Sequence, residues 1–79
     1  MKKNIKVISS YNKALAIDSK STGALYKRAC AYALSGNKAK ALNDLSKAIE
    51  LNVEMKDGAK KEKGFKSLWS DPDFKKITN

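Results

Sequence analysis

The chain repeats itself at an interval of 34 residues, from Tyr11 to Leu45. Residues 11–18 read YNKALAID and residues 45–52 read LSKAIELN, and the pairs Leu15/Ile49 and Ile17/Leu51 are apolar in both copies. Self-similarity at about 34 residues is typical of helical hairpins stacked side by side, in which no single unit buries its apolar face alone. The repeat therefore predicts an all-α fold of antiparallel helical hairpins, and it directs the search for function towards surfaces.

Three segments have the apolar pattern of helices. Apolar residues recur at three- and four-residue steps over residues 3–18 and again over residues 38–51, which predicts two helices with one buried face each. Asp44 falls on the polar side of the second of these, so we expect it to face water. Residues 24–34 are apolar nearly all round and rich in alanine, which predicts a thin helix covered on more than one side.

The connections and the C-terminal tail carry turn and cap signals. Residues 19–22 contain Ser and Thr as N-cap candidates, and residues 35–37 place Gly and Asn where one helix ends and the next begins. Residues 53–63 predict a weak, mostly charged helix that is broken at Gly64. Residues 70–73, Ser-Asp-Pro-Asp, predict a new helix start. We expect the tail to fold as an aromatic lid whose apolar residues are Phe65, Leu68, Trp69, Phe74 and Ile77.

The composition excludes most of the common kinds of catalytic site. The 79 residues contain no histidine and one cysteine, Cys30, which excludes histidine bases and ligands, an internal disulfide and a zinc site built on paired cysteines. Asp71 and Asp73 are the only close carboxylates, and helix capping explains them better than a calcium loop. We therefore predict no enzyme activity, no cofactor and no metal. The lack of a signal peptide or apolar span, with one unpaired thiol, predicts a cytoplasmic protein without a membrane partner.

The net charge of +9 at pH 7 is the strongest compositional signal. The basic residues are spread along the chain, and only one of the 17 is arginine. Because proteins that read bases and phosphates favour the bidentate guanidinium, this pattern favours a solvated lysine surface over a nucleic-acid site. A small basic nucleic-acid-binding protein is the alternative function. In either case the charge attracts acidic partners.

Residues 22–53 resemble the tetratricopeptide repeat, a helix-turn-helix unit of this length. The positions that carry the resemblance are Leu25, Ala29, Tyr32, Gly36, Ala41, Leu45, Ala48 and Leu51. The chain departs from the family pattern at Arg28, where an apolar residue is frequent, and at Lys38, where an aromatic one is. Ser19 and Val53 also depart from it, because they stand where a proline usually closes the unit. The resemblance implies a single domain and a short superhelix, in which residues 1–18 are the outer helix of a partial repeat and residues 54–79 a partial helix with an aromatic capping segment.

The same resemblance implies a binding groove for a protein or peptide partner. Its residues would be Gly23, Tyr26, Cys30, Ala33, Leu34 and, from the following helix, Lys60. The clamp that some members use for acidic C-terminal tails needs polar residues where this chain has Tyr26 and Cys30, so we do not predict that specificity. The chain would thus be a non-enzymatic interaction module with an acidic partner. The alternative is that the aromatic lid or a second subunit fills the groove.

The first unit lacks its inner helix, so one apolar side of residues 3–18 is expected to be partly bare. Ile5 and Ile8 lie on that side, and we expect them to mediate self-association as a homodimer. The competing explanation is that the chain is a segment of a longer repeat array. A third possibility is a purely structural, oligomerising fragment that binds no ligand in its groove.

Overall fold

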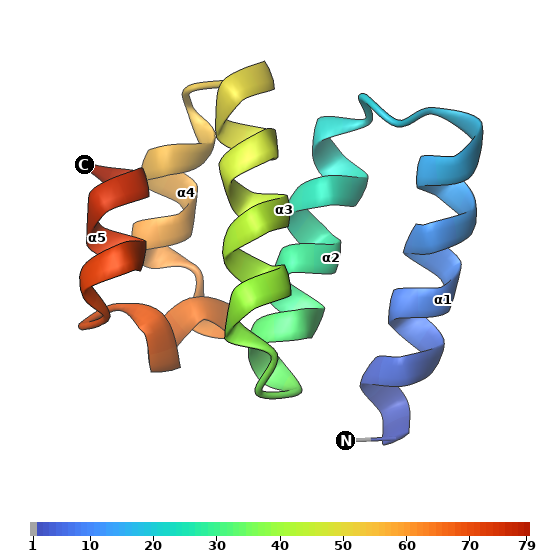
Figure 1. Cartoon of the computed structure of the whole chain (residues 1–79), viewed down its shortest axis with the longest axis horizontal. Coiled ribbons are helices and arrows are strands. Elements are labelled where there is room, and N and C mark those ends of the chain that lie inside the picture. Colours follow the sequence, from blue (N-terminus) through green and yellow to red (C-terminus); the bar gives the residue numbers. More distant parts are fainter. Residues whose placement is uncertain (1) are drawn as a thin grey trace.

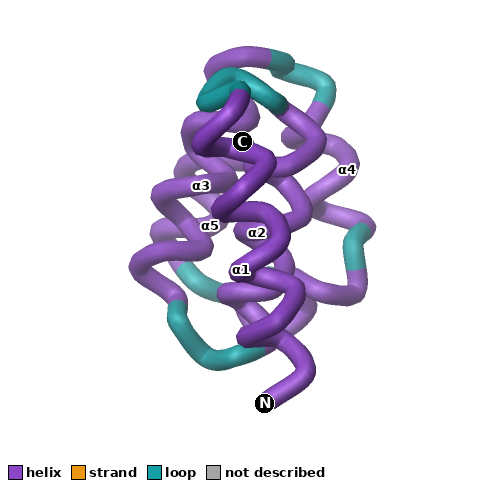
Figure 2. Tube along the Cα trace, turned by 90° about the vertical axis from the view of Figure 1, so that its right-hand side faces the viewer, coloured by secondary structure: helices purple, strands orange, loops and turns teal. Residues whose placement is uncertain are grey.

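The computed structural model describes the backbone of residues 2–79 and the side chains of residues 8–79. Over these residues the chain is helical, without strands, and its elements are α1 (Lys2–Ile17), α2 (Thr22–Leu34), α3 (Lys38–Leu51), α4 (Met55–Lys61), the 3-10 helix η1 (Lys63–Leu68) and α5 (Pro72–Thr78). Helices α1 to α4 run alternately up and down beside one another, and α5 lies beyond α4 (Figure 1). A view from the α1 side shows helices joined by short loops (Figure 2). The all-α prediction is confirmed.

The helices begin and end where the cap residues indicate. The side chains of Ser21 and Asn37 each accept a hydrogen bond, at 3.4 Å, from the amide three residues further on, at the starts of α2 and α3. Asp71 does the same for α5 through the amides of the two residues after Pro72, at 2.9 and 3.2 Å. Gly36 has φ +84°, a left-handed conformation that ends α2 and that other residues adopt only with strain.

Alanine sets the spacing of the helices. Ala29 on α2, Ala41 and Ala48 on α3, and Ala59 on α4 are each 0% exposed. With only a methyl group between backbones, the helix axes approach closely, and a larger side chain at these positions would overpack the core. A smaller cluster joins Leu15, Leu25 and Ala48. The main cluster consists of Ala29, Ala33, Ala41, Leu45, Ala59 and the lid side chains Phe65, Leu68 and Phe74.

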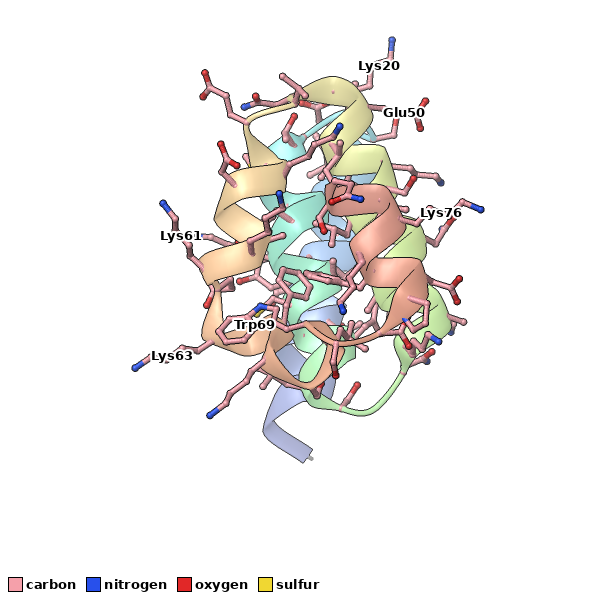
Figure 3. The ribbon with its side chains drawn as sticks, turned by 90° about the vertical axis from the view of Figure 1, so that its left-hand side faces the viewer. Lys20, Glu50, Lys61, Lys63, Trp69 and Lys76 are labelled. Carbon is pink, nitrogen blue, oxygen red and sulfur yellow. The ribbon has the colours of Figure 1, made fainter. Side chains whose placement is uncertain are left out.

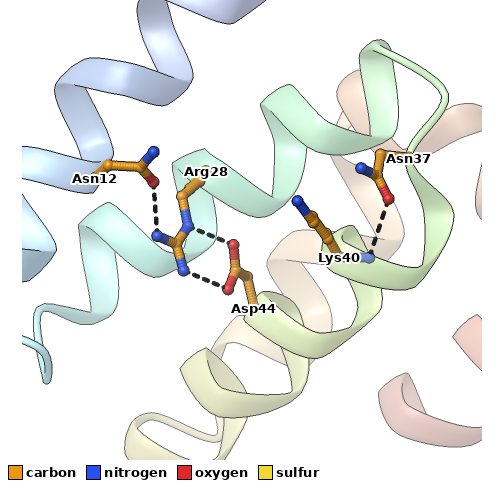
Figure 4. Close-up of polar contacts among 5 residues, drawn as sticks. All are labelled: Asn12, Arg28, Asn37, Lys40 and Asp44. Carbon is orange, nitrogen blue, oxygen red and sulfur yellow. Dashed lines mark hydrogen bonds and ion pairs between the residues drawn. The ribbon is translucent and has the colours of Figure 1, made fainter.

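The prediction that Asp44 faces water is wrong, because Asp44 is 1% exposed. The Arg28 guanidinium on α2 donates to both Asp44 carboxylate oxygens, at 2.6 and 2.7 Å, and to the side-chain oxygen of Asn12 on α1 at 2.8 Å (Figure 4). A paired, bidentate carboxylate tolerates burial that an unpaired one does not. One side chain that departs from the family pattern therefore joins α1, α2 and α3.

A second departure from the family pattern, Lys38, contacts the last helix, α5 (Pro72–Thr78). Its ammonium lies 2.6 Å from the Asp71 carboxylate and 3.4 Å from that of Asp73, so the start of α3 meets the start of α5. The Lys38 ammonium and the capped backbone amides hold the pKa of Asp71 below its ordinary value. As the Lys38 side chain is 46% exposed, we expect this pair to orient α5 more than to stabilise it.

The predicted helix break at Gly64 is misplaced. Helix α4 ends at Lys61, and Glu62 leaves the helix and caps η1 by accepting a hydrogen bond from the Gly64 amide at 3.3 Å. Gly64 lies inside η1 and is buried because η1 packs against α2 there. The glycine is needed for this close approach and not for ending a helix.

The two residues predicted for self-association lie in α1. The side chain of Ile5 is outside the described residues, and Ile8 is half-buried. Further along α1, Leu15 is buried against α2 and α3, whereas Ile17 is 90% exposed. Within the described part of the chain, none of the helices combines the length and the apolar character that a membrane crossing needs.

Candidate functional site

Helix α2 carries five of the six residues predicted to line a partner groove, and its middle is covered by the chain itself. The ring of Phe65, on η1, meets the Tyr26 ring edge-on, with centroids 5.5 Å apart at 75°. Gly64 lies so close to Cys30 that a Cβ placed on it would be 1.9 Å from Cys30 Sγ. The lid therefore occupies the central part of the expected groove. This agrees with the alternative in which the aromatic lid fills the groove.

The covered side chains have altered acidities. Burial, followed by the nearby Glu62 carboxylate and Cys30, raises the pKa of Tyr26 to about 12. Burial and Glu62 also raise the pKa of the Cys30 thiol. Both groups are therefore neutral at physiological pH, so Cys30 lacks the depressed pKa that marks a reactive nucleophile.

Beyond the lid contact, an open hollow of about 700 Å³ remains between the end of α2 and η1. We call it the α2–η1 hollow; it is lined by Ala33, Leu34, Gly36, Lys63, Gly64, Lys66 and Ser67. Leu34, at the end of α2, is 56% exposed. Of the predicted groove residues, Leu34 is exposed at this hollow, whereas Ala33 lines it but is only 7% exposed.

The charge of the α2–η1 hollow is positive. Lys63 and Lys66 are exposed, and among the described residues neither forms an ion pair. Lys63 extends away from the protein into solvent (Figure 3). The nearest carboxylate in sequence, Glu62, does not line the hollow and is held by the Gly64 amide. An apolar floor with a cationic rim suits an acidic segment that also carries an apolar side chain.

The remaining predicted groove residues are separated from this surface. Gly23 is exposed near the opposite end of α2. Lys60 lies on α4 and lines a different pocket, together with Trp69 and Lys75. The structure thus does not gather the six residues into one groove, and their role in partner binding stays a prediction.

Sequence reasoning missed the contribution of η1. It assigned the tail to an apolar lid, and it gave no role to Lys63, Lys66 and Ser67, which form one side of the hollow. The signal that could have found them is the spacing of Lys63 and Lys66, three residues apart on one helical turn, beside the lid residue Phe65. No three Cys, Asp or Glu side chains within residues 8–79 are grouped as a metal site would need.

Comparison with known proteins adds one finding. The family model of the tetratricopeptide repeat matches residues 23–53, which run from the second residue of α2 to the second residue after α3. The comparisons with curated proteins and with solved structures gave no match.

Proposed function

We propose that the protein, whose residues 23–53 match the family model of the tetratricopeptide repeat, is a non-enzymatic interaction module that binds an acidic peptide segment in the α2–η1 hollow. Tetratricopeptide repeats generally bind protein partners and are typically not catalytic. The partner segment would place an apolar side chain on Leu34 and its carboxylates near Lys63 and Lys66.

The observation that carries this proposal is the exposure of Leu34 inside a cationic rim. A 56% exposed leucine at the mouth of an apolar hollow loses unfavourable contact with water when a partner covers it. Lys63 and Lys66 add long-range attraction for acidic segments and favour their approach over that of basic ones. Because the lid already fills the middle of the groove, we expect one short contact segment and modest affinity.

A peptide-display selection on the intact chain tests this proposal. We expect enriched peptides to combine Asp or Glu with one large apolar residue, and to lose binding in Leu34→Ser and in the double variant Lys63→Gln/Lys66→Gln. The matched control is Lys13→Gln/Lys27→Gln, which removes the same charge from exposed positions on α1 and α2. Enriched peptides without acidic residues, or equal loss in the control, would contradict the proposal.

The net charge of +9 keeps nucleic acid as the second candidate ligand. Attraction by exposed lysines alone weakens steeply between about 50 and 200 mM salt and shows no sequence preference. Tight binding of a defined nucleic acid at about 150 mM salt, unaffected by Leu34→Ser, would favour that function over the peptide module.

Self-association through α1 is a separate proposal. It is supported by the 90% exposure of Ile17 on a helix that packs on α2 through its other side. Light scattering tests it, and a monomer of 8.7 kDa at concentrations of tens of micromolar would exclude the homodimer.

A further inference from the structure

Three of the four large apolar side chains that are exposed among residues 8–79 lie near one end of the molecule. Ile17 is the last residue of α1 and is 90% exposed, Leu51 is the last of α3 and is 45% exposed, and Val53, just beyond α3, is 64% exposed. The ends of α1 and α3 and the start of α2 lie at the same end of the helices (Figure 1). We call residues 17–24 and 47–54, which lie at this end, the α1–α3 end surface. Exposed apolar side chains that gather in one region are typical of a protein–protein contact.

A hollow of about 190 Å³ opens in the α1–α3 end surface, between the loop after α1 and the last turns of α3. Beneath it the core is closed, since Leu25 is 3% exposed and packs with Leu15 and Ala48. The hollow is below the size of pockets that hold small molecules, so it suits a single side chain of a protein partner. It is lined by Ser19, Lys20, Leu25, Lys47, Glu50 and Leu51.

The α1–α3 end surface differs in charge from the rest of the protein. It carries the two lysines Lys20 and Lys47 and the three acids Asp18, Glu50 and Glu54, a net charge of −1, whereas the whole chain carries +9. Two copies of the chain that met through their lysine-rich faces would repel each other, and this repulsion is absent at the end surface. For the same reason, an acidic peptide or a nucleic acid gains little attraction here.

The charged side chains of the end surface are available to a partner. All five are exposed, and none of them belongs to an ion pair within the described part of the chain. Lys20 and Glu50 are seen at the same end of the molecule (Figure 3). Across a two-fold axis the lysines of one copy face the acids of the other, and the reverse, so a surface with both signs of charge is complementary to itself.

We propose that two copies of this chain associate through their α1–α3 end surfaces, with Ile17 and Leu51 of the two copies covering one another. Lys20 and Lys47 of each copy then face the acids of the other. Such a dimer is one form of the self-association proposed above, on which it rests, with its interface at the end of the helices and not along the side of α1. Removal of the apolar side chains from water favours the contact, and the charge pairs fix its orientation. The end surface shares no residue with the α2–η1 hollow, so a second copy and a peptide do not compete for the same residues.

Sedimentation equilibrium of the intact protein at tens of micromolar, at low salt where charges are little screened, measures this association. We expect a monomer–dimer equilibrium that is at least about tenfold weaker in Ile17→Ser/Leu51→Ser. Both side chains are exposed, so the variant should keep its fold, which circular dichroism checks. The control Leu34→Ser removes the remaining exposed large apolar side chain of residues 8–79 and should leave the association unchanged.

An exchange of charges tests the orientation of the two copies. Lys20→Glu/Lys47→Glu changes the net charge of the end surface from −1 to −5, and Glu50→Lys/Glu54→Lys changes it to +3. Each variant repels its own copies, so we expect each alone to associate at least about tenfold more weakly than the natural protein. An equimolar mixture of the two variants should restore the dimer. This recovery depends on complementary charge and cannot arise from unfolding of either variant.

The outcomes separate this interface from self-association in general. A natural protein that is monomeric under these conditions contradicts both. A dimer that survives Ile17→Ser/Leu51→Ser, or a mixture of the charge variants that stays monomeric, contradicts this interface alone and leaves the proposal of self-association intact. Loss of the dimer in Leu34→Ser would place the contact at the α2–η1 hollow and would also contradict it.

Discussion

The contact between Gly64 and Cys30 allows a quantitative test of how the lid is seated on α2. Gly64 is buried and does not have a positive φ, so alanine is conformationally acceptable there. The added methyl group, however, would lie 1.9 Å from Cys30 Sγ, far inside van der Waals contact. Cys30 Cβ would be 3.5 Å and Glu62 Cγ 3.7 Å away, which are ordinary contacts. The sulfur atom alone makes the substitution unfavourable.

Two effects determine how much Gly64→Ala changes the free energy of unfolding. Overpacking of a buried site typically costs about 1–3 kcal/mol, whereas replacing glycine by alanine at a compatible position contributes about 0.4–1 kcal/mol through the unfolded chain. We therefore expect Gly64→Ala to lower the free energy of unfolding by about 1–2 kcal/mol in the natural background. In a Cys30→Ala background the sulfur is gone, so the same substitution should be neutral or stabilise by about 0.5 kcal/mol.

The coupling between positions 30 and 64 is measured with a double-mutant cycle, which compares the natural protein, Gly64→Ala, Cys30→Ala and the double variant. Urea unfolding of these four proteins is followed by Trp69 fluorescence and by the circular dichroism of the helices. The difference between the two backgrounds gives an expected coupling free energy of about 1–2.5 kcal/mol. A coupling below about 0.3 kcal/mol is the additive behaviour of independent sites. It would mean that the cysteine side chain simply rotates away and that the lid is not seated on this sulfur.

Three further predictions concern the polar contacts of the core and the lid. Asp44→Asn should lower the free energy of unfolding by about 2 kcal/mol, because it leaves the Arg28 guanidinium without its anion. Urea unfolding measures this, and a loss below about 0.5 kcal/mol would show that the ion pair is effectively solvated. Asp71→Ala should lower the free energy of unfolding, because it removes the side-chain cap of α5. Because Lys38 depresses the folded-state pKa of Asp71, its contribution is complete above the ordinary value of 3.8 and is lost as the pH falls through the lower folded value. When the pH is lowered, the free energy of unfolding should therefore fall less in Asp71→Ala than in the natural protein. Parallel curves of the free energy of unfolding against pH would contradict this. The Cys30 thiol, whose pKa burial raises, should react with iodoacetamide at neutral pH far more slowly than glutathione does, and equal rates would show that the lid opens freely.

Local signals predicted the helical elements well because their causes are local. The third helix was expected over residues 38–51 and forms over those residues, since Asn37 caps its start and its apolar face recurs at helical spacing. Pro72 and Asp71 likewise fixed the start of α5. These signals act within a few residues of the backbone that they organise.

The candidate site was predicted less well, because it depends on which distant segments meet. Groove positions on α2 could be numbered from the repeat, but nothing in their spacing showed that Phe65 would cover Tyr26 and leave Leu34 in the open. The rim lysines of the hollow lie on η1, some 30 residues further along the chain from Leu34. Charge runs along the sequence do not show which lysines will share a surface.

The sequence by itself determined the helices, their caps, the alanine spacing and the repeat, because periodicity and backbone capping are properties of neighbouring residues. Only the tertiary structure decided the roles of Arg28, Lys38 and Gly64. Arg28 was expected only to depart from an apolar pattern, yet it neutralises the buried Asp44 and bridges three helices. Lys38 meets the cap of α5, and Gly64 admits the sulfur of Cys30. The energy of an ion pair or of a close contact depends on a partner far away in the chain, and its position is set only when the helices have packed.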